Sequence, residues 1–243
     1  MKTALVTGAS RGIGNAIARD LARQHYGLTV SSRSDADLDA LASTLLADGS
    51  PQVVRHAVDL ADRDLLPALV TSHREAFGSM DALVLSGGVG TAGAFESMPE
   101  RRIDKTMTVN VTSTITLIQQ ALPLLRRAAA TSDSGARVVL FSSITGVFAE
   151  AGLAVYGASK AALVSLASSL NVEESGNGVM FTAVAPAYVD TDMSAWTTDT
   201  VPADTMIPVE DIVTIVRALL DLGRRTSITE LVVSRSGASP YSA

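Results

Sequence analysis

The sequence of 243 residues contains no cysteine, which excludes disulfide bonds and thiolate metal sites. Its three histidines, His25, His56 and His73, are scattered along the chain without the spacing of metal ligands. We therefore expect no metal site.

Long apolar runs and clusters of basic residues are also missing. No apolar segment approaches the ~20 residues of a membrane-spanning helix, and the short apolar stretch near Met1 reaches a glycine turn too early for a signal peptide. The formal charge of -6, with no run of Lys and Arg, argues against nucleic acid as a partner. We expect a cytoplasmic protein that contacts neither membrane nor nucleic acid.

Apolar runs of strand length alternate with amphipathic stretches of helix length. Because these runs are apolar nearly throughout, each strand is expected to be covered on both faces, as in a parallel sheet. A 243-residue chain with 47% hydrophobic residues fills one α/β core. We predict a single α/β domain over residues 1–243, with a Rossmann-type doubly wound parallel sheet of about seven strands and helices on both faces. The predicted strands are Ala4–Val6, Leu28–Val30, Val53–Val58, Ala82–Leu85, Val138–Phe141, Met180–Val184 and Leu231–Val233.

A glycine-rich turn joins the first predicted strand to the first predicted helix. Glycines allow a tight turn and close backbone approach, and the free amides of a helix N-terminus attract pyrophosphate. A purely structural turn is the alternative, but the position between strand and helix favours a dinucleotide site. The turn reads Thr7-Gly8-Ala9-Ser10-Arg11-Gly12-Ile13-Gly14.

The second predicted strand ends without the acid that often binds the ribose 2′-hydroxyl of NAD. It continues as Ser31-Ser32-Arg33-Ser34, with no carboxylate until Asp35. Arg33 suits a 2′-phosphate, and Arg11 in the glycine turn could reach the same phosphate. The sequence therefore favours NADP(H) over NAD(H), with solvated loop charges as the alternative for either arginine.

Tyr156 and Lys160 are four residues apart, so a helix would place them on one face. A free tyrosine has a pKa near 10, and proton exchange at neutral pH requires a pKa lower by about 3, which we expect the ammonium to supply. Ser143 follows the strand Val138–Phe141, at the sheet edge where ligands bind, and its hydroxyl could hold a substrate oxygen. An isolated YxxxK pair is a weak signal, but the order of the three motifs favours catalysis.

Together these motifs resemble the short-chain dehydrogenase/reductase family over nearly the whole chain, in particular its compact NADPH-dependent carbonyl reductases, including the 3-oxoacyl-acyl-carrier-protein reductase type. The family motif TGxxxGxG is matched by Thr7, Gly8, Gly12 and Gly14. The family's aspartate near adenine is matched by Asp59, which precedes Leu60.

The resemblance also implies the functional residues. The family tetrad maps onto Asn110, Ser143, Tyr156 and Lys160, with the backbone of Asn110 supporting a water-linked proton relay. Lys160 would also bond the nicotinamide ribose. In the segment that starts at Pro186, Val189 and Thr191 would approach the carboxamide.

Two positions depart from the family pattern. The usual NNAG is replaced by Leu85-Ser86-Gly87-Gly88, where Ser86 offers only a short hydroxyl link while Gly87 and Gly88 still permit close approach to the cofactor. The usual PG is replaced by Pro186-Ala187. Alanine does not adopt a positive φ easily, so we expect a slightly different loop path.

Residues 191–209 are the expected substrate loop. Its large apolar residues are Trp196 and Met206, which suggests an open pocket in which Trp196 either contacts substrate or anchors the loop. The stretches Ile103–Leu125 and Ala154–Leu170 are apolar around much of their circumference. The family pairs these helices, which implies a homodimer or homotetramer.

The sequence thus predicts an oxidoreductase that reduces a carbonyl of a small molecule, with Tyr156 as proton donor. A non-catalytic NADP-binding sensor or scaffold is the alternative, and a sugar epimerase or dehydratase is disfavoured because too few residues follow Val189 for its substrate domain. No residue cluster identifies the substrate or the direction of the reaction.

Overall fold

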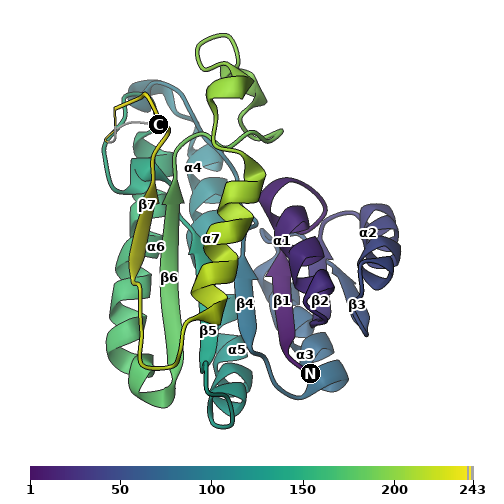
Figure 1. The fold of residues 1–243 in the computed structure, drawn as a ribbon. Coiled ribbons are helices and arrows are strands. Elements are labelled where there is room, and N and C mark those ends of the chain that lie inside the picture. Colours follow the sequence, from purple (N-terminus) through teal and green to yellow (C-terminus); the bar gives the residue numbers. More distant parts are fainter. Residues whose placement is uncertain (240, 242–243) are drawn as a thin grey trace.

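Each predicted apolar run forms a strand of one parallel sheet in the computed structural model, which describes residues 1–239 and 241 (Figure 1). The order of its seven strands is β3-β2-β1-β4-β5-β6-β7. The strands are β1 (Thr3–Thr7), β2 (Gly27–Ser32), β3 (Val53–Ala57), β4 (Ala82–Leu85), β5 (Ala136–Phe141), β6 (Val179–Pro186) and β7 (Glu230–Val233).

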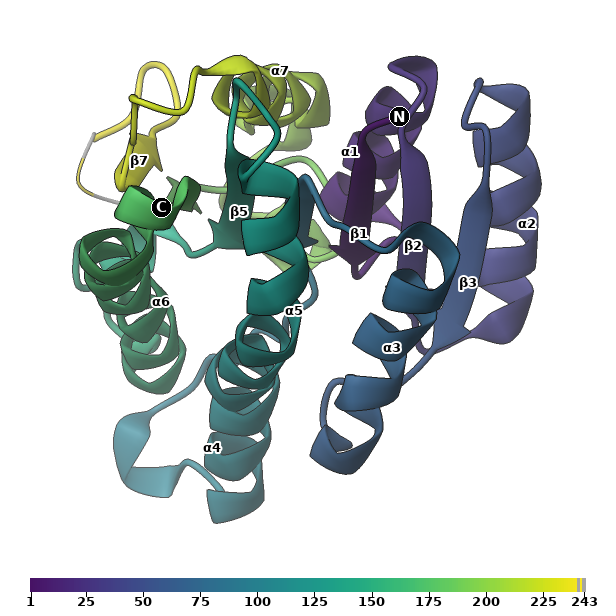
Figure 2. The ribbon, with the colours of Figure 1, turned by 90° about the horizontal axis from the view of Figure 1, so that it is seen from below.

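Helices cover both faces of the sheet. Figure 2 shows α1, α2 and α7 on one face and α3, α5 and α6 on the other, with α4 leading into α5. This arrangement confirms the predicted doubly wound fold. The helices are α1 (Gly12–Arg23), α2 (Asp35–Ala47), α3 (Leu66–Phe77), α4 (Glu100–Met107), α5 (Ser113–Ala129), α6 (Ala154–Glu174) and α7 (Val209–Asp221).

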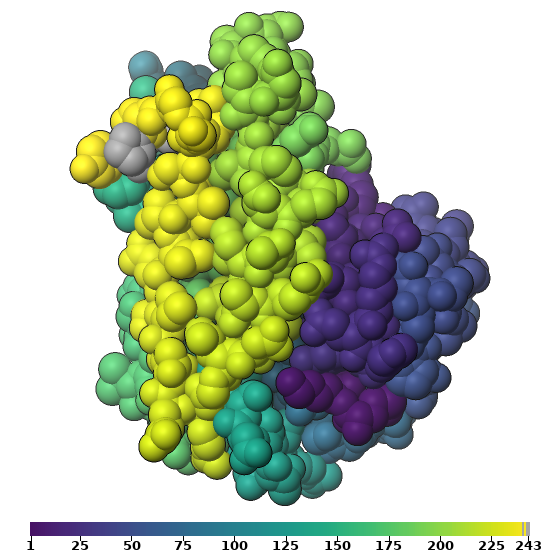
Figure 3. All heavy atoms as spheres, viewed as in Figure 1, coloured from purple at the N-terminus to yellow at the C-terminus, as the bar shows by residue number. Residues whose placement is uncertain are grey.

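The segment between β6 and α7 stands above the carboxyl ends of the strands and forms a projection of the surface (Figures 1 and 3). Val189 and Ile207 pair as a parallel bridge at its base. The backbone amide of Ile207 donates to the carbonyl of Tyr188 at 2.9 Å, and that of Asp190 donates to the carbonyl of Ile207 at 3.0 Å. The predicted substrate loop is therefore closed at its base by backbone hydrogen bonds between its two ends.

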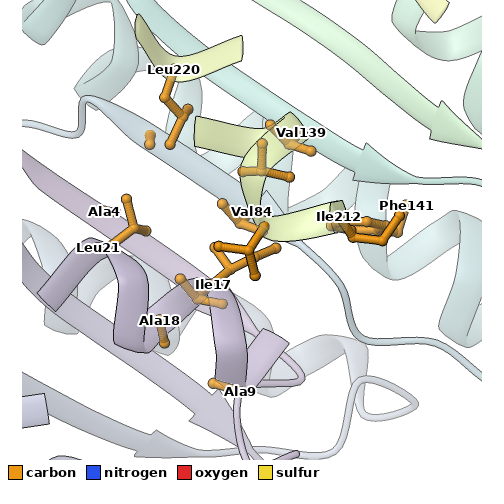
Figure 4. Packing of buried hydrophobic residues seen from close by; sticks show 14 of the residues in the cluster. Ala4, Ala9, Ile17, Ala18, Leu21, Val84, Val139, Phe141, Ile212 and Leu220 are labelled. Carbon is orange, nitrogen blue, oxygen red and sulfur yellow. The ribbon is translucent and has the colours of Figure 1, made fainter. Parts of the chain in front are cut away.

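Two apolar clusters, one on each face of the sheet, explain why the strands are apolar throughout. Ala4 and Val6 of β1 point into the cluster under α1 and α7, while Leu5 between them points into the cluster under α3, α5 and α6. Figure 4 shows the first cluster, in which Ile17 and Leu21 of α1 lie near the sheet residues. A polar residue in the inner strands is therefore buried, as Thr29 of β2 and Thr182 of β6 are, whereas Arg55 in the edge strand β3 is exposed.

The strand order reverses at β1, because β2 lies on one side of it and β4 on the other. Open α/β sheets form a crevice at the carboxyl ends of the strands at such a reversal. Thr7 at the end of β1 pairs with Leu85 at the end of β4, and the motifs named above follow directly after these strands. The topology therefore brings them to one edge of the sheet.

Three local observations complete the fold. Helix α5 extends to Ala129, and a short segment rich in Ser leads from it to β5. No helix in the described part of the chain is long and apolar enough to cross a membrane. Within residues 1–239 and 241, no group of His, Asp and Glu side chains is arranged to hold a metal ion.

Candidate active site

A cleft of about 580 Å³ opens at the carboxyl edge of the sheet. All residues predicted to bind the cofactor line it, as do Ser143, Tyr156 and Lys160. Asn110 does not line the cleft and lies behind its wall. The structure thus gathers residues from distant parts of the chain around one cavity, which has the position expected for a dinucleotide site.

The glycine turn has the geometry that close backbone approach requires. Gly8 has a φ of +64°, and a Cβ at this position would lie only 2.8 Å from the Cα of Gly87. A Cβ on Gly14 would overlap the carbonyl oxygen of Gly8 and the hydroxyl of Ser86. Helix α1 starts at Gly12 without a side-chain cap, so its first amides remain available to a phosphate.

Arg11 and Arg33 both line the cleft, but they differ in their contacts. Nη1 of Arg11 lies 3.4 Å from Oδ2 of Asp192, in an ion pair whose side chains are 70% and 71% exposed. Such exposed pairs contribute little energy, so Arg11 can exchange this partner for a phosphate. Arg33 lies beside Ser31 and Ser32 at the cleft wall. The link between Arg11 and Asp192 joins the glycine turn to the substrate loop and was not predicted.

Ser86 replaces the missing amide side chains with a link to β1. Its hydroxyl donates to the carbonyl of Thr7 at 2.5 Å, and the amide of Gly87 donates to the hydroxyl of Thr7 at 3.3 Å. These bonds hold the ends of β1 and β4 together beside the cleft. The hydroxyl link that the sequence suggested is therefore present.

The side chains of Ser143 and Tyr156 both line the cleft and interact there, since the Ser143 hydroxyl acts to lower the pKa of Tyr156. Oγ of Ser143 also accepts from the hydroxyl of Thr145 at 3.0 Å and from its amide at 3.3 Å. Burial raises the pKa of Tyr156 to about 12, and the bond from Ser143 offsets this only in part. The expected lowering of the Tyr156 pKa is therefore wrong for this structure, because loss of hydration, with a smaller contribution from Tyr188, outweighs the effect of Ser143.

Lys160 is buried at the base of the cleft, one helical turn beyond Tyr156 on α6. Its Nζ lies 5.6 Å from the centroid of the Tyr156 ring and donates to the carbonyl of Phe141 at 2.7 Å. Burial lowers the pKa of Lys160 to about 8. The hydroxyl of Ser142 donates to the carbonyl of Lys160 at 2.8 Å, which fixes α6 against the end of β5.

Asn110 sits in a π-helical turn, Thr108–Thr112, between α4 and α5. Its side chain accepts from the amide of Val89 at 2.9 Å and donates to the carbonyl of Val89 and to the hydroxyl of Ser159, both at 3.0 Å. A Cβ on Gly88 would lie 3.2 Å from Oδ1 of Asn110 and 3.5 Å from Nζ of Lys160. Asn110 therefore supports the backbone beside Lys160, and π turns of this kind often occur at functional sites.

Ala187 replaces a glycine of the family pattern without strain. Within the described residues, His25 is the only non-glycine residue with a positive φ, so Ala187 has an ordinary backbone. Its amide donates to the carbonyl of Val233 at 2.8 Å. The loop after Pro186 thus continues the pairing between β6 and β7, and Val189 and Thr191 still line the cleft.

The sequence analysis missed several cleft residues, among them Leu153, Tyr188, Arg102 and Lys105. Tyr188 stacks edge-on against Trp196, with ring centroids 6.3 Å apart, and Trp196 itself is 64% exposed. The spacing of Arg102 and Lys105 by three residues on one helix was the signal that could have revealed the last two.

Known proteins share both the sequence and the fold. The short chain dehydrogenase family matches residues 2–201. The chain is 34% identical over 194 residues to the 3-oxoacyl-acyl-carrier-protein reductase FabG of Staphylococcus aureus, covering 79% of this chain and 76% of the relative. It is 36% identical over 195 residues to the oxidoreductase UcpA of Salmonella typhimurium, covering 79% and 71%.

Solved structures agree with this result. An alcohol dehydrogenase from the archaeon Thermococcus sibiricus, complexed with 5-hydroxy-NADP, has a TM-score of 0.87 at 27% identity and covers 100% of this chain and 98% of its own. A 3-oxoacyl-acyl-carrier-protein reductase from Brucella melitensis, in complex with NAD, has a TM-score of 0.85 at 28% identity and covers 96% and 94%. The chain therefore belongs to the short-chain dehydrogenase family, as an oxidoreductase that interconverts CH–OH and C=O groups with NAD(P).

Proposed function

We propose that the protein reduces a ketone or 3-oxoacyl carbonyl to an alcohol, with NADPH as the preferred cofactor and Tyr156 as the proton donor. The observation that carries this proposal is the contact of the Tyr156 and Ser143 hydroxyls inside the cleft, with the ammonium of Lys160 5.6 Å from the phenol ring.

The residues around the cleft fit a nicotinamide dinucleotide. Gly8, Gly14 and the uncapped start of α1 provide a backbone surface for the pyrophosphate, and Asp59 and Leu60 line the wall expected for the adenine. When bound, this cofactor supplies the hydride. The side chains of Ser143, Tyr156 and Lys160 stabilise the developing charge and supply the proton.

Ser143 is arranged to donate a hydrogen bond. Its oxygen already accepts two bonds from Thr145, so its own proton is free to point at a partner. Tyr156 is the neighbouring group whose pKa the Ser143 hydroxyl lowers in this structure, and a substrate carbonyl oxygen would accept from both hydroxyls. Thr145 thereby orients Ser143, which stabilises the negative charge that develops on the carbonyl oxygen during reduction.

Tyr156 holds the proton that the new alcohol requires. With a pKa raised to about 12, its phenol is protonated at neutral pH, which suits a proton donor. Once the proton has moved to the substrate oxygen, the phenolate lies near the ammonium of Lys160, which favours the charged form. The remaining N–H groups of Lys160 are available to the nicotinamide ribose.

Arg11, Arg33 and the absence of a carboxylate from Ser31 to Ser34 support the preference for NADPH. We also infer one catalytic domain over residues 1–243, with residues 191–209 as the substrate loop. We further infer a homodimer or homotetramer that pairs α4, α5 and α6, on which Met107 and Val172 are exposed. The cytoplasmic location stays a prediction.

The test follows NADPH oxidation with a panel of ketones, acetoacetyl thioesters and diketones, run beside NADH. We expect turnover of at least one carbonyl and a higher kcat/KM with NADPH, and we expect Arg33→Ala to reduce that preference about 10-fold. Equal kcat/KM values for the two cofactors would contradict the preference. Tight NADPH binding without oxidation by any carbonyl would instead support the sensor.

A further inference from the structure

The cleft extends beyond the cofactor residues to one face of α4. Arg102, Lys105 and Val109 all line it, and their spacing of three and then four residues places them along one stripe of the helix. Val109 directly precedes Asn110 in the π turn. The two cations therefore lie on the same helical segment as Asn110, which supports the backbone beside Lys160.

Hydrogen bonds fix Arg102 at the rim of the cleft, against the loop that contains Thr91 and Ala92. Nη2 of Arg102 donates to the carbonyl of Ala92 at 3.3 Å, and the hydroxyls of Thr91 and Thr106 are bonded at 2.5 Å. The amide of Gly93 donates to the carbonyl of Gly152 at 2.9 Å, which ties this loop to the one between β5 and α6. That second loop carries Ser143. This rim is separate from the glycine turn of β1.

Positive charge in the cleft exceeds negative charge, although the chain as a whole has a formal charge of -6. The carboxylates that line the cleft are Asp59 and Asp192. Asp192 pairs with Arg11, and Asp59 accepts a bond from the amide of Ala61. Neither carboxylate balances the cations of α4.

Arg102 and Lys105 thus remain without a carboxylate partner inside the protein. Within residues 1–239 and 241, the ammonium of Lys105 forms no hydrogen bond or ion pair, and the guanidinium of Arg102 forms only the bond to the carbonyl of Ala92. The acids of α4, Glu100 and Asp104, do not line the cleft. Both cations are exposed, line the cleft and carry N–H groups without a partner, so they can donate hydrogen bonds to a bound anion.

We propose that Arg102 and Lys105 form an anion-recognition site at the substrate end of the cleft, so that the preferred substrate is a carbonyl compound bearing a carboxylate or phosphate. This inference rests on the proposed carbonyl reduction and adds the substrate class. The guanidinium of Arg102 binds two oxygens of the anion side by side, while Lys105 adds a point charge. Both hold the substrate with its carbonyl toward Ser143 and Tyr156.

Three aldehydes of similar shape test the proposal: 4-formylbenzoate, 4-formylphenyl phosphate and the neutral methyl 4-formylbenzoate. Their reduction by NADPH is compared in the wild type, in Arg102→Ala/Lys105→Ala, and in the control Arg101→Ala, an exposed arginine of α4 that does not line the cleft. We expect the double variant to lower kcat/KM for the anions about 10- to 100-fold, mainly through KM, and to change the ester less than about 2-fold. The anion with the larger loss identifies the preferred group.

Binding is measured separately from turnover through the fluorescence of Trp196, the single tryptophan, which lines the cleft. Weaker binding of both anions to the double variant, with the ester and Arg101→Ala unaffected, supports the site even if no aldehyde is reduced. Absence of turnover would then count against the carbonyl reduction alone. Equal affinity of the wild type and the double variant for the anions would overturn the anion site, as would equal losses for anions and ester.

Discussion

Two tyrosine–lysine pairs lie at opposite ends of the sheet, and one of them faces the cleft. Nζ of Lys2 lies 5.9 Å from the Tyr26 ring, and Nζ of Lys160 lies 5.6 Å from the Tyr156 ring. Burial raises the pKa of both phenols to about 12. A phenol beside an ammonium is therefore not by itself a catalytic device.

The surroundings of the two pairs differ. Asp81 and Asp221 raise the pKa of Tyr26 further, whereas the bond from Ser143 works against the rise at Tyr156. Tyr156 also lines the cleft, while Tyr26 is only 4% exposed. The hydroxyl partner and the access to a ligand distinguish the functional pair, and each prediction below tests one part of that distinction.

The largest contrast is expected in activity. Tyr156→Phe removes the proposed proton donor, and we expect kcat/KM for carbonyl reduction to fall about 100- to 10,000-fold. Tyr26→Phe removes the other phenol and should leave the activity within about 2-fold of the wild type. Steady-state kinetics of both variants, with folding checked by circular dichroism, provide the measurement. Similar losses in the two variants would contradict the comparison.

The second contrast concerns the lysines and the pH dependence of stability. Lys160 has a folded pKa lowered to about 8 from 10.5, so the unfolded state binds more protons between these values and stability rises with pH there. Compared with Lys160→Met, the wild type should gain about 3 kcal/mol in the free energy of unfolding from pH 8 to 10.5.

Urea unfolding at several pH values measures this gain, with Lys2→Met at the other pair as the matched variant. A wild type and Lys160→Met that follow parallel curves would show that burial of the ammonium is not retained in solution.

A third experiment tests the raised phenol pKa that the two pairs share. The folded pKa of Tyr26 is raised to about 12 from 10.0, so its contribution to stability is complete below pH 10 and is lost as pH rises toward 12. Relative to Tyr26→Phe, the wild type should lose about 1.4 kcal/mol between pH 10 and 11. Tyr156→Phe should show a difference of the same sign. A wild type that loses no more than Tyr26→Phe would argue against the raised pKa.

The smallest effect on activity is expected at Tyr188 and Trp196, two aromatic residues that line the cleft with Tyr156. The Tyr26 pair does not line the cleft. Trp196→Ala removes the edge-on contact with Tyr188, and KM should rise about 3- to 10-fold with little change in kcat. Phe95→Ala is the control, since Phe95 is 71% exposed and does not line the cleft. An unchanged KM would identify Trp196 as a loop anchor.

Much of the fold followed from the sequence, because parallel strands buried on both faces are apolar at most positions. The run from Val138 to Phe141 was therefore visible without any structural information, as was the glycine turn from Gly8 to Gly14. It was also predictable that Ser143 and Tyr156 lie close together. Ser143 follows a strand at the carboxyl edge of the sheet, where ligands bind, and helix periodicity places Tyr156 on the same face as Lys160.

Other features depend on contacts that no local pattern encodes. The pKa of Tyr156 was misjudged because the sequence shows Lys160 as a neighbour but does not show how little water reaches the phenol. The pairing of Arg11 with Asp192 joins residues 181 positions apart in the chain. The spacing of Arg102 and Lys105 in the sequence indicates one helix face, but the structure is needed to show that this face lies beside the cleft.

The π turn at Thr108–Thr112 fixes the length of the helical segment that runs from α4 to α5. A π turn accommodates one residue more than a regular turn, so deletion of a single residue there would restore an uninterrupted α-helix. The residues before the deletion would then turn by about 100° relative to those after it. Arg102 and Lys105 would rotate away from Asn110 and the reacting groups, so this one additional residue sets the angle between substrate recognition and chemistry.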